Sequence, residues 1–214
     1  MLVTGIFISL EGPDGAGKST AAQSLVPLME QVSQQEVVLT REPGGSQIAE
    51  QIRQVILDVN NSAMDQRTEA LLYAAARRQH LVDVILPALA ANKIVLSDRY
   101  IDSSVAYQGA GRQIGTQAVW QLNMFATEQL LPQLTLYLDV PAEVGLSRIQ
   151  HQRTTGLDRL EQEQLAFHKR VQQAYMQLLQ DNPQRIKRVD ATQAPAQVVQ
   201  NCLQIMMTQF KWAR

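Results

Sequence analysis

The residues Gly12-Pro-Asp-Gly-Ala-Gly-Lys18-Ser19 follow a short apolar run and begin a stretch with helical periodicity. They fit the pattern G-x-x-x-x-G-K-[ST], in which glycines let the backbone turn tightly and direct its N–H groups at phosphate oxygens. The N-terminus of the following helix adds partial positive charge at the same point. A plain glycine-rich turn is the alternative, but a strand before the loop and a helix after it favour nucleoside triphosphate binding.

The same loop predicts a magnesium site. In loops of this kind the lysine bridges the β- and γ-phosphates and the following hydroxyl binds Mg²⁺, which assigns these roles to Lys18 and Ser19. Asp98 ends the apolar run Ile94-Val-Leu-Ser, where a second acid of the magnesium shell is expected. An isolated Asp after a strand is usually a cap or turn residue, so the prediction for Asp98 depends on the loop.

Apolar runs alternate with helical periodicities along the chain, which implies right-handed βαβ units. We therefore predict an α/β protein with the three-layer P-loop NTPase fold, a five-stranded parallel sheet and helices on both faces. The predicted strands are Gly5–Leu10, Glu36–Thr40, Lys93–Asp98, Gln133–Val140 and Ile186–Asp190. The predicted helices are Lys18–Gln31, Ser46–Leu57, Glu69–Ala91 (capped by Thr68 and kinked or divided at Pro87), Gln117–Leu131, one that begins at Pro141, Leu165–Asp181 and Pro195–Lys211.

Length and charge limit the other possibilities. The chain has 214 residues, which favours one domain covering 1–214, and its 19 Lys+Arg against 20 Asp+Glu give a net charge of −1. Polymeric nucleic acid is not an expected partner, because its binding requires a clustered surplus of cations. No uninterrupted apolar run reaches 18 residues, so no membrane partner is expected. The single Cys202 cannot form an internal disulfide, and the N-terminus lacks a basic leader; we expect a cytoplasmic protein.

Other classes of triphosphate-binding protein fit the sequence less well. A GTPase needs an Asn-Lys-x-Asp motif, whereas Asn92-Lys93 continues as Ile94-Val95. A GTPase also places Gly three residues after the strand-end acid, whereas Asp98 is followed by Arg99-Tyr-Ile101. AAA-type and transporter ATPases generally need longer chains and further motifs. A small kinase remains, and it explains why arginines follow the strands, since a phosphorylated acceptor needs cations to receive it.

Several further motifs carry a family resemblance. They are Glu11–Thr20, Thr40-Arg-Glu-Pro-Gly-Gly45, Leu72–Arg77, Ser97-Asp-Arg-Tyr100, Ala106-Tyr-Gln-Gly-Ala-Gly-Arg112, Leu136–Val140, Leu157–Glu161 and Val189–Thr192. In this order and spacing the chain resembles the thymidylate kinase family of the bacterial type along nearly its whole length. The resemblance implies transfer of the γ-phosphoryl group of ATP to dTMP, giving dTDP and ADP with Mg²⁺, in dTTP synthesis de novo and by salvage. It also implies a homodimer, for which an apolar helix face such as Val119–Leu131 is available.

The resemblance also assigns binding residues. Those for ATP are Gly12, Pro13, Asp14, Gly15, Ala16, Gly17, Lys18, Ser19, Thr20 and Thr192. For dTMP, the resemblance implies that Asp14 accepts from the 3′-hydroxyl and that Arg99 and Arg41 bind the phosphate. Tyr73 stands where the family usually has a Phe that stacks on thymine, and Arg77 would donate to a base carbonyl. Ser104 and Gln108 would complete the thymine edge, and Pro43 would line the same site.

The family divides by the position of its catalytic arginine. Here Pro13–Ala16 contains no arginine, whereas a segment at about 148–163 contains three. The resemblance therefore implies the lid-arginine class, with this segment as a short lid. Arg153 is the first choice for stabilising the transferred charge and Arg148 and Arg159 follow, beside Lys18 and Arg99 as the other catalytic residues.

Two alternatives stay open on the sequence. One is a kinase for another nucleoside monophosphate or nucleoside, which would differ from this prediction at the acceptor residues. The other is a non-catalytic ATP-binding module, which would need neither the Asp98-Arg99 pair nor a segment carrying arginines.

Overall fold

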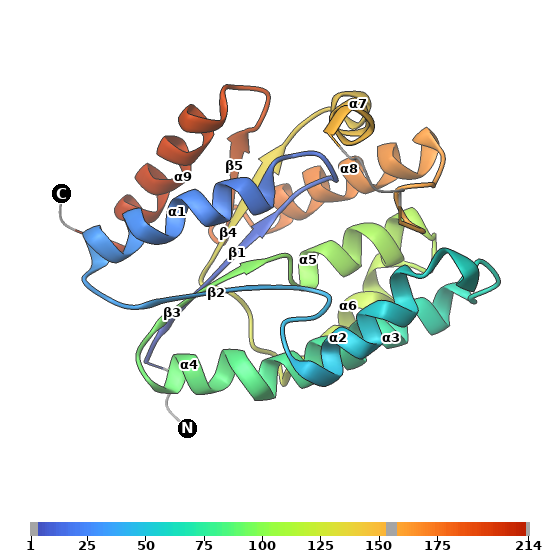
Figure 1. Cartoon of the computed structure of the whole chain (residues 1–214), viewed down its shortest axis with the longest axis horizontal. Coiled ribbons are helices and arrows are strands. Elements are labelled where there is room, and N and C mark those ends of the chain that lie inside the picture. The colour runs from blue at the N-terminus through green and yellow to red at the C-terminus, as the bar shows by residue number, and fades with distance from the viewer. Residues whose placement is uncertain (1–3, 153–157, 213–214) are drawn as a thin grey trace.

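A five-stranded parallel sheet forms the centre of the protein, as a computed structural model of residues 4–152 and 158–212 shows (Figure 1). Its strand order is β2-β3-β1-β4-β5. The strands are β1 (Ile6–Glu11), β2 (Val37–Arg41), β3 (Ile94–Asp98), β4 (Leu134–Asp139) and β5 (Ile186–Asp190). The predicted fold class is therefore confirmed, and each predicted strand lies within a residue or two of its observed bounds.

The central strands explain why their sequences are continuously apolar. β1 pairs with β3 on one side and β4 on the other, and helices cover both faces, so most of their side chains are buried. The register sets Leu10 opposite Asp98. Because all five strands are parallel, the loop after β1 and the acid that ends β3 meet at the same edge of the sheet.

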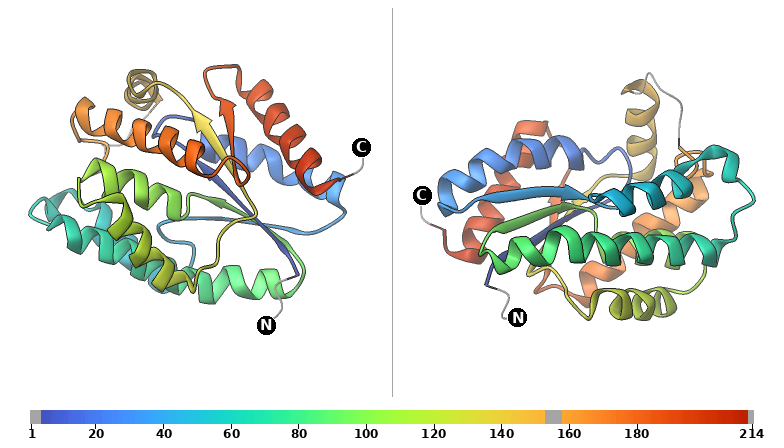
Figure 2. Two further views of the ribbon diagram at one scale, coloured as in Figure 1. Left: turned by 180° about the vertical axis from the view of Figure 1, so that it is seen from behind. Right: turned by 60° about the horizontal axis from the view of Figure 1, so that its bottom comes forward.

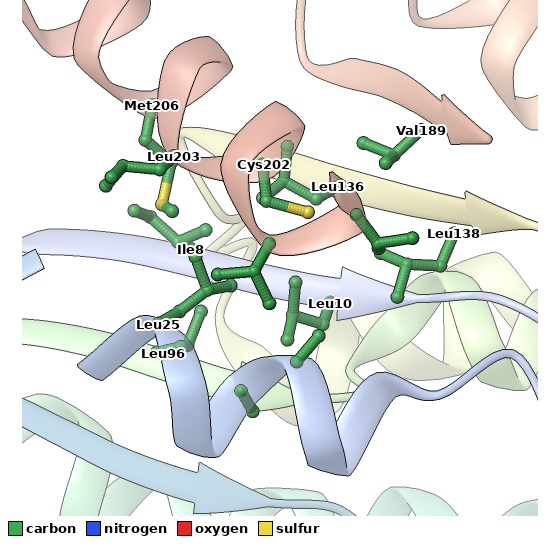
Figure 3. Close-up of a cluster of buried hydrophobic side chains, with 14 of the residues drawn as sticks. Ile8, Leu10, Leu25, Leu96, Leu136, Leu138, Val189, Cys202, Leu203 and Met206 are labelled. Carbon is green, nitrogen blue, oxygen red and sulfur yellow. The ribbon is translucent and has the colours of Figure 1, made fainter. Parts of the chain in front are cut away.

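Helices form a layer on each side of the sheet (Figure 2). On one face α1 (Lys18–Ser33) and α9 (Pro195–Phe210) lie side by side and pack on Ile8, Leu10 and Leu136 (Figure 3). Cys202 of α9 is a buried member of this core. The opposite face is covered by η2 (Leu81–Ile85), α4 (Leu86–Ala90), α5 (Ile101–Ser104), η3 (Val105–Gly111) and α8 (Leu165–Asp181), and α3 (Gln66–His80) packs on η2 and η3 beside them. The remaining helices are α2 (Gln47–Leu57), η1 (Val59–Asn61), α6 (Thr116–Thr127) and α7 (Ala142–Gln152).

The long helix predicted over Glu69–Ala91 begins earlier than predicted, at Gln66, and is divided before Pro87, as the prediction allowed. Thr68 is not its cap: the Asp65 carboxylate accepts from the backbone N–H groups of Arg67 and Thr68, so α3 begins at Gln66. Proline neither donates an N–H nor tolerates the carbonyl four residues before it. The helix changes to a π-helical turn, η2, just before Pro87. There the Leu86 N–H donates to the carbonyl five residues earlier, that of Leu81.

Three further differences lie near the site. The helices α5 and η3 were not predicted, although both pack into the core. The helix predicted to reach Leu131 ends at Thr127, because Glu128 adopts a left-handed conformation with φ 51°. Pro141 lies one residue before α7, and its carbonyl accepts from the Gly145 N–H. Among the described residues no helix is long and apolar enough to span a membrane.

Candidate functional site

The loop between β1 and α1 is shaped by glycines in conformations that other residues avoid. Gly12, Gly15 and Gly17 have φ values of 140°, 74° and 84°. The Lys18 ammonium folds back over the loop and donates to the carbonyls of Gly12 (3.0 Å) and Pro13 (2.8 Å). Burial, together with the nearby charge of Arg99, lowers the pKa of Lys18 to about 8. A phosphate anion at this point would favour the charged ammonium and offer it a stronger acceptor than the two carbonyls.

Ser19 and Asp98 form a hydrogen-bonded pair next to the loop. The Ser19 hydroxyl donates to Asp98 Oδ2 over 2.6 Å, from the first turn of α1 to the end of β3. Hydroxyl and carboxylate oxygens are hard donors of the kind that Mg²⁺ prefers, and Mg²⁺ usually takes few protein ligands beside water and phosphate oxygens. The pair fits such an ion. Within the described part of the chain, no group of three or more His, Cys, Asp or Glu side chains offers a site built from protein ligands alone.

A cavity of about 960 Å³ runs along this edge of the sheet. It begins at the phosphate-binding loop, passes the ends of β2 and β3, and reaches α3 and η3. Its lining contains most of the residues singled out from the sequence: Asp14, Gly15, Ala16, Gly17, Lys18, Ser19, Thr20, Arg41, Pro43, Tyr73, Arg77, Asp98, Arg99, Ser104, Gln108 and Arg148. Its volume lies at the upper end of the range of about 300–1,000 Å³ that is typical of small-molecule sites.

Arg99 and Asp14 face each other in the middle of this cavity. Arg99 Nη2 lies 2.5 Å from Asp14 Oδ1, and the Tyr107 hydroxyl donates to Asp14 Oδ2 over 2.7 Å. Burial by itself would raise the pKa of Asp14, but the charges of Arg99 and Lys18 outweigh it and hold this pKa below its usual range. Arg99 also donates to the Gly12 carbonyl and to Ser103 Oγ, so the guanidinium is fixed from three sides.

Tyr73 and Arg77 line the cavity beyond Arg99. Tyr73 lies there, and burial raises the pKa of its hydroxyl, which keeps the ring neutral. Arg77 is 2% exposed and donates to Glu42 Oε2 (2.6 Å), Ser104 Oγ (3.0 Å) and the Tyr100 carbonyl (3.0 Å), as well as to Asn123. Its guanidinium plane is thereby set by the protein before any ligand binds.

Helix α7 packs directly against the phosphate-binding loop at Gly15 and Gly145. A Cβ atom on Gly15 would lie 2.1 Å from the Gly145 carbonyl oxygen, and one on Gly145 would lie 2.4 Å from the Asp14 carbonyl oxygen. Arg148, one turn further along α7, donates to the carbonyls of Gly15 (3.3 Å) and Ala191 (3.0 Å). α7 is therefore tied to the loop by backbone contact and by one side chain.

A family model described as thymidylate kinase matches residues 10–202 of the chain. The chain belongs to the thymidylate kinase family. It is 60% identical over 204 residues to the thymidylate kinase of Latilactobacillus sakei, which covers 95% of each chain. It is 58% identical over 209 residues to that of Lactiplantibacillus plantarum, covering 98% of this chain and 95% of the relative. The crystal structure of thymidylate kinase from Ehrlichia chaffeensis superposes with a TM-score of 0.76 at 29% identity, covering 95% of this chain and 98% of the other. The family resemblance noted from the motifs is confirmed.

Not every residue predicted from the thymidylate kinase motifs lies at the cavity. The Gly12 and Pro13 carbonyls face Lys18, and Thr192 bonds to Asp190 while its neighbours Ala191 and Gln193 line the cavity. Arg159 does not line it either, because its guanidinium binds the Glu69 carboxylate and the Ile56 carbonyl. Arg153 lies outside the described residues.

Three residues of the thymidylate kinase site were missed by sequence reasoning. Arg53 lines the cavity from α2, donates to the Pro43 carbonyl over 2.7 Å, and has its pKa lowered by burial. It belongs to none of the motifs, so the sequence held no signal for it. Tyr107 is part of a quoted motif and Ser103 precedes the predicted site residue Ser104, but their role depends on α5 and η3, whose helical geometry was not predicted.

Proposed function

We propose that this protein transfers the γ-phosphoryl group of ATP to dTMP, giving dTDP and ADP. The observation that supports this best is one continuous cavity that is lined both by the phosphate-binding loop and by Tyr73 and Arg77. Arg99 lies between the two, where the acceptor phosphate has to meet the γ-phosphate. Family membership supplies the identity of the acceptor.

The acceptor is proposed to bind by its phosphate, its sugar and its base. Arg99 is already fixed in place and binds the dTMP phosphate together with Arg41, whose side chain is 54% exposed and paired with Glu50 over 2.9 Å. Asp14 accepts from the 3′-hydroxyl group. Tyr73 stacks on the thymine ring, and Arg77 donates to a base carbonyl with the one Nη2 hydrogen that Tyr100 leaves free.

Catalysis is proposed to come from positioning and positive charge. The attacking atom is a phosphate oxygen that is largely deprotonated at pH 7, so no general base is required. Lys18 and Arg99 stabilise the charge that spreads over the transferred group. Mg²⁺ held by Ser19 and Asp98 would neutralise charge on the phosphates when bound. Arg153 is the proposed charge-stabilising arginine of the 148–163 segment, which we propose to be a lid. Arg148 is proposed as a supporting cation, since it lines the cavity and donates to the Gly15 carbonyl.

We further propose that the protein is a homodimer through α3 and α6. Phe125 on α6 is 86% exposed and Leu71 on α3 is 57% exposed, and Val82 continues the same exposed stripe at 43%. Arg78 joins the two helices, since it donates to the Ala126 carbonyl and pairs with Glu128. A face of this kind, apolar and spread over two packed helices, suits a second copy of the chain. Cytoplasmic localisation and the absence of a polymeric nucleic-acid partner stay predictions from the sequence.

The test is ADP release by the purified protein with ATP, Mg²⁺ and one acceptor at a time, chosen from dTMP, dUMP, dCMP, UMP and AMP. We expect kcat/KM for dTMP to exceed that for every other acceptor. Faster turnover of another acceptor would reassign the substrate, and ATP binding without turnover on any of them would overturn the kinase proposal.

A further inference from the structure

Glu69 lies behind Gln108, just outside the lining of the cavity. It is in the first turn of α3, is 0% exposed and is not among the cavity-lining residues. Its carboxylate accepts from Gln108 Nε2 (2.9 Å), from Arg112 Nε (3.2 Å) and from Arg159 Nη2 (2.5 Å). A carboxylate with two guanidinium partners is held in one place.

Gln108 is the one of these three partners that lines the cavity. It lies on η3 and is 1% exposed. A carboxylate only accepts hydrogen bonds, so the NH₂ end of the Gln108 amide has to face Glu69; the reversed amide would place two oxygens in contact. Its other end, Oε1, accepts no hydrogen bond from residues 4–152 or 158–212. Gln108 therefore presents a hydrogen-bond acceptor, Oε1, to the cavity and not a donor.

This polarity matches one feature of the proposed acceptor. Thymine carries an N–H at N3, whereas cytosine carries a lone pair there; uracil has the same N–H as thymine. We propose that Glu69 is a positioning residue for base selection: it fixes the amide of Gln108 so that Oε1 accepts from N3–H and repels the N3 lone pair of cytosine. The inference rests on the proposed function, because it takes the base to lie at Gln108.

The surroundings of Glu69 explain how the orientation is kept. Arg112 also pairs with Glu163 and lies over the Phe167 ring, 5.0 Å from its centroid. Arg159 donates in addition to the Ile56 carbonyl. Both arginines are thus anchored independently of Glu69, and a rotation of the Glu69 carboxylate would leave them without their shared acceptor.

The experiment compares kcat/KM for dTMP, dCMP and dUMP in the wild type and in Glu69→Gln. A Gln at position 69 can donate as well as accept, so the Gln108 amide is free to reverse. We expect the dTMP to dCMP ratio to fall about tenfold, mainly through KM for dTMP, as one correctly directed hydrogen bond is lost. We expect the dTMP to dUMP ratio to stay within about twofold, because both bases have the same N3–H.

Glu163→Gln is the matched control. It removes another carboxylate partner of Arg112 but has no contact with Gln108, and it should leave the dTMP to dCMP ratio unchanged. If Glu69→Gln fails to fold, the charge-matched Glu69→Gln/Arg159→Gln variant replaces it, with Arg159→Gln as its reference. An unchanged dTMP to dCMP ratio in a folded variant overturns the inference, and so does an equal fall of both ratios. A wild type that does not favour dTMP overturns the proposed function instead, and this is measured first.

Discussion

Asp14 and Arg99 form an ion pair across the cavity, with 2.5 Å between the carboxylate Oδ1 and Nη2. One residue comes from the phosphate-binding loop and the other directly follows β3, so the pair joins the part of the site that holds the donor to the part that receives the acceptor. The two groups neutralise each other in a buried place where neither could remain charged alone at low cost. An acceptor with a phosphate and a sugar hydroxyl offers new partners to both.

Asp14→Asn tests this relationship. It keeps the shape of the side chain and removes its charge, so Arg99 loses its ion pair and the acceptor loses a charged hydrogen-bond partner. We expect KM for dTMP to rise about 10- to 100-fold, as for hydrogen bonds to charged groups, while KM for ATP changes less than about threefold. Steady-state kinetics with each substrate varied in turn measure both. Tyr107→Phe keeps the Asp14 carboxylate and removes one hydrogen-bond donor to it, so KM for dTMP should rise less in this variant. In Asp14→Asn, an equal rise in KM for dTMP and KM for ATP would contradict the assignment.

Arg153 and Arg159 are expected to behave differently although both belong to the 148–163 segment. Arg153→Ala should lower kcat by about 10³-fold with a much smaller change in KM for dTMP, which is the effect of removing a charge-stabilising arginine. Arg159→Ala should mainly lower the thermal midpoint, because its guanidinium is bound to Glu69 and Ile56 away from the cavity. Turnover and melting curves of the two variants separate these effects. Wild-type turnover by Arg153→Ala would exclude it from the role.

The pH dependence of stability should reveal Glu11, which is buried at the end of β1 and accepts from Tyr100 N, Ser103 Oγ and the Tyr175 hydroxyl. Burial, with the neighbouring charge of Asp102, raises its pKa from 4.5 to about 7. Between these two pH values the folded state binds a proton that the unfolded state lacks. The free energy of unfolding of the wild type therefore falls, through this group, as pH rises from 4.5 to 7, and changes no further above that.

Glu11→Gln should remove this contribution, since its amide stays neutral. We expect the difference in free energy of unfolding, variant minus wild type, to increase by up to about 3 kcal/mol from pH 4.5 to pH 8. Urea unfolding of both proteins at pH 5, 6, 7 and 8 measures the difference. Two curves that remain parallel over this range would show that Glu11 is ionised in the folded protein throughout.

Phe125→Glu should convert a dimer into a monomer, because it places a charge at the centre of the exposed apolar face on α3 and α6. Sedimentation or light scattering at several protein concentrations measures the mass. Val144→Glu is the control: Val144 is 38% exposed but lies on α7, and its substitution should leave the mass unchanged. A wild-type monomer at all concentrations would exclude the interface.

The sequence predicted those parts of the fold that depend on local pattern. The bounds of β5 and α8 agree with the prediction to the residue. A clear helical period indicates α8, whereas β5 was the weaker prediction, with only Ile186 and Val189 buried. The η3 segment was missed because Val105–Gly111 contains two glycines and follows neither a helical nor a strand period. The end of α6 was misplaced because apolar residues continue to Leu131, whereas the backbone turns at Glu128.

The site was predictable where a motif specifies backbone geometry, and less so where side chains meet from distant segments. The placing of Ser19 beside Asp98 follows from strand order and from the loop pattern. Two ion pairs, Arg77 with Glu42 and Arg159 with Glu69, form only because α3 packs as it does. No spacing along the chain indicates either pair. From the sequence, Arg148 and Arg159 ranked together behind Arg153. In the structure Arg148 donates to the Gly15 carbonyl and lines the cavity, whereas Arg159 pairs with Glu69 outside the cavity lining.

The contact between Gly15 and Gly145 has a consequence for how this chain can vary. The Cβ atom of any other residue at either position would clash with a main-chain carbonyl oxygen. Helix α7 would then have to move away from the phosphate-binding loop, together with Arg148. Neither substitution can be relieved by a second one nearby, since each carbonyl oxygen in the contact belongs to the main chain. The two positions should therefore remain glycine together in functional descendants of this chain. Attempts to alter the length or chemistry of the segment that follows α7 should begin beyond that helix and leave its first turn as it is.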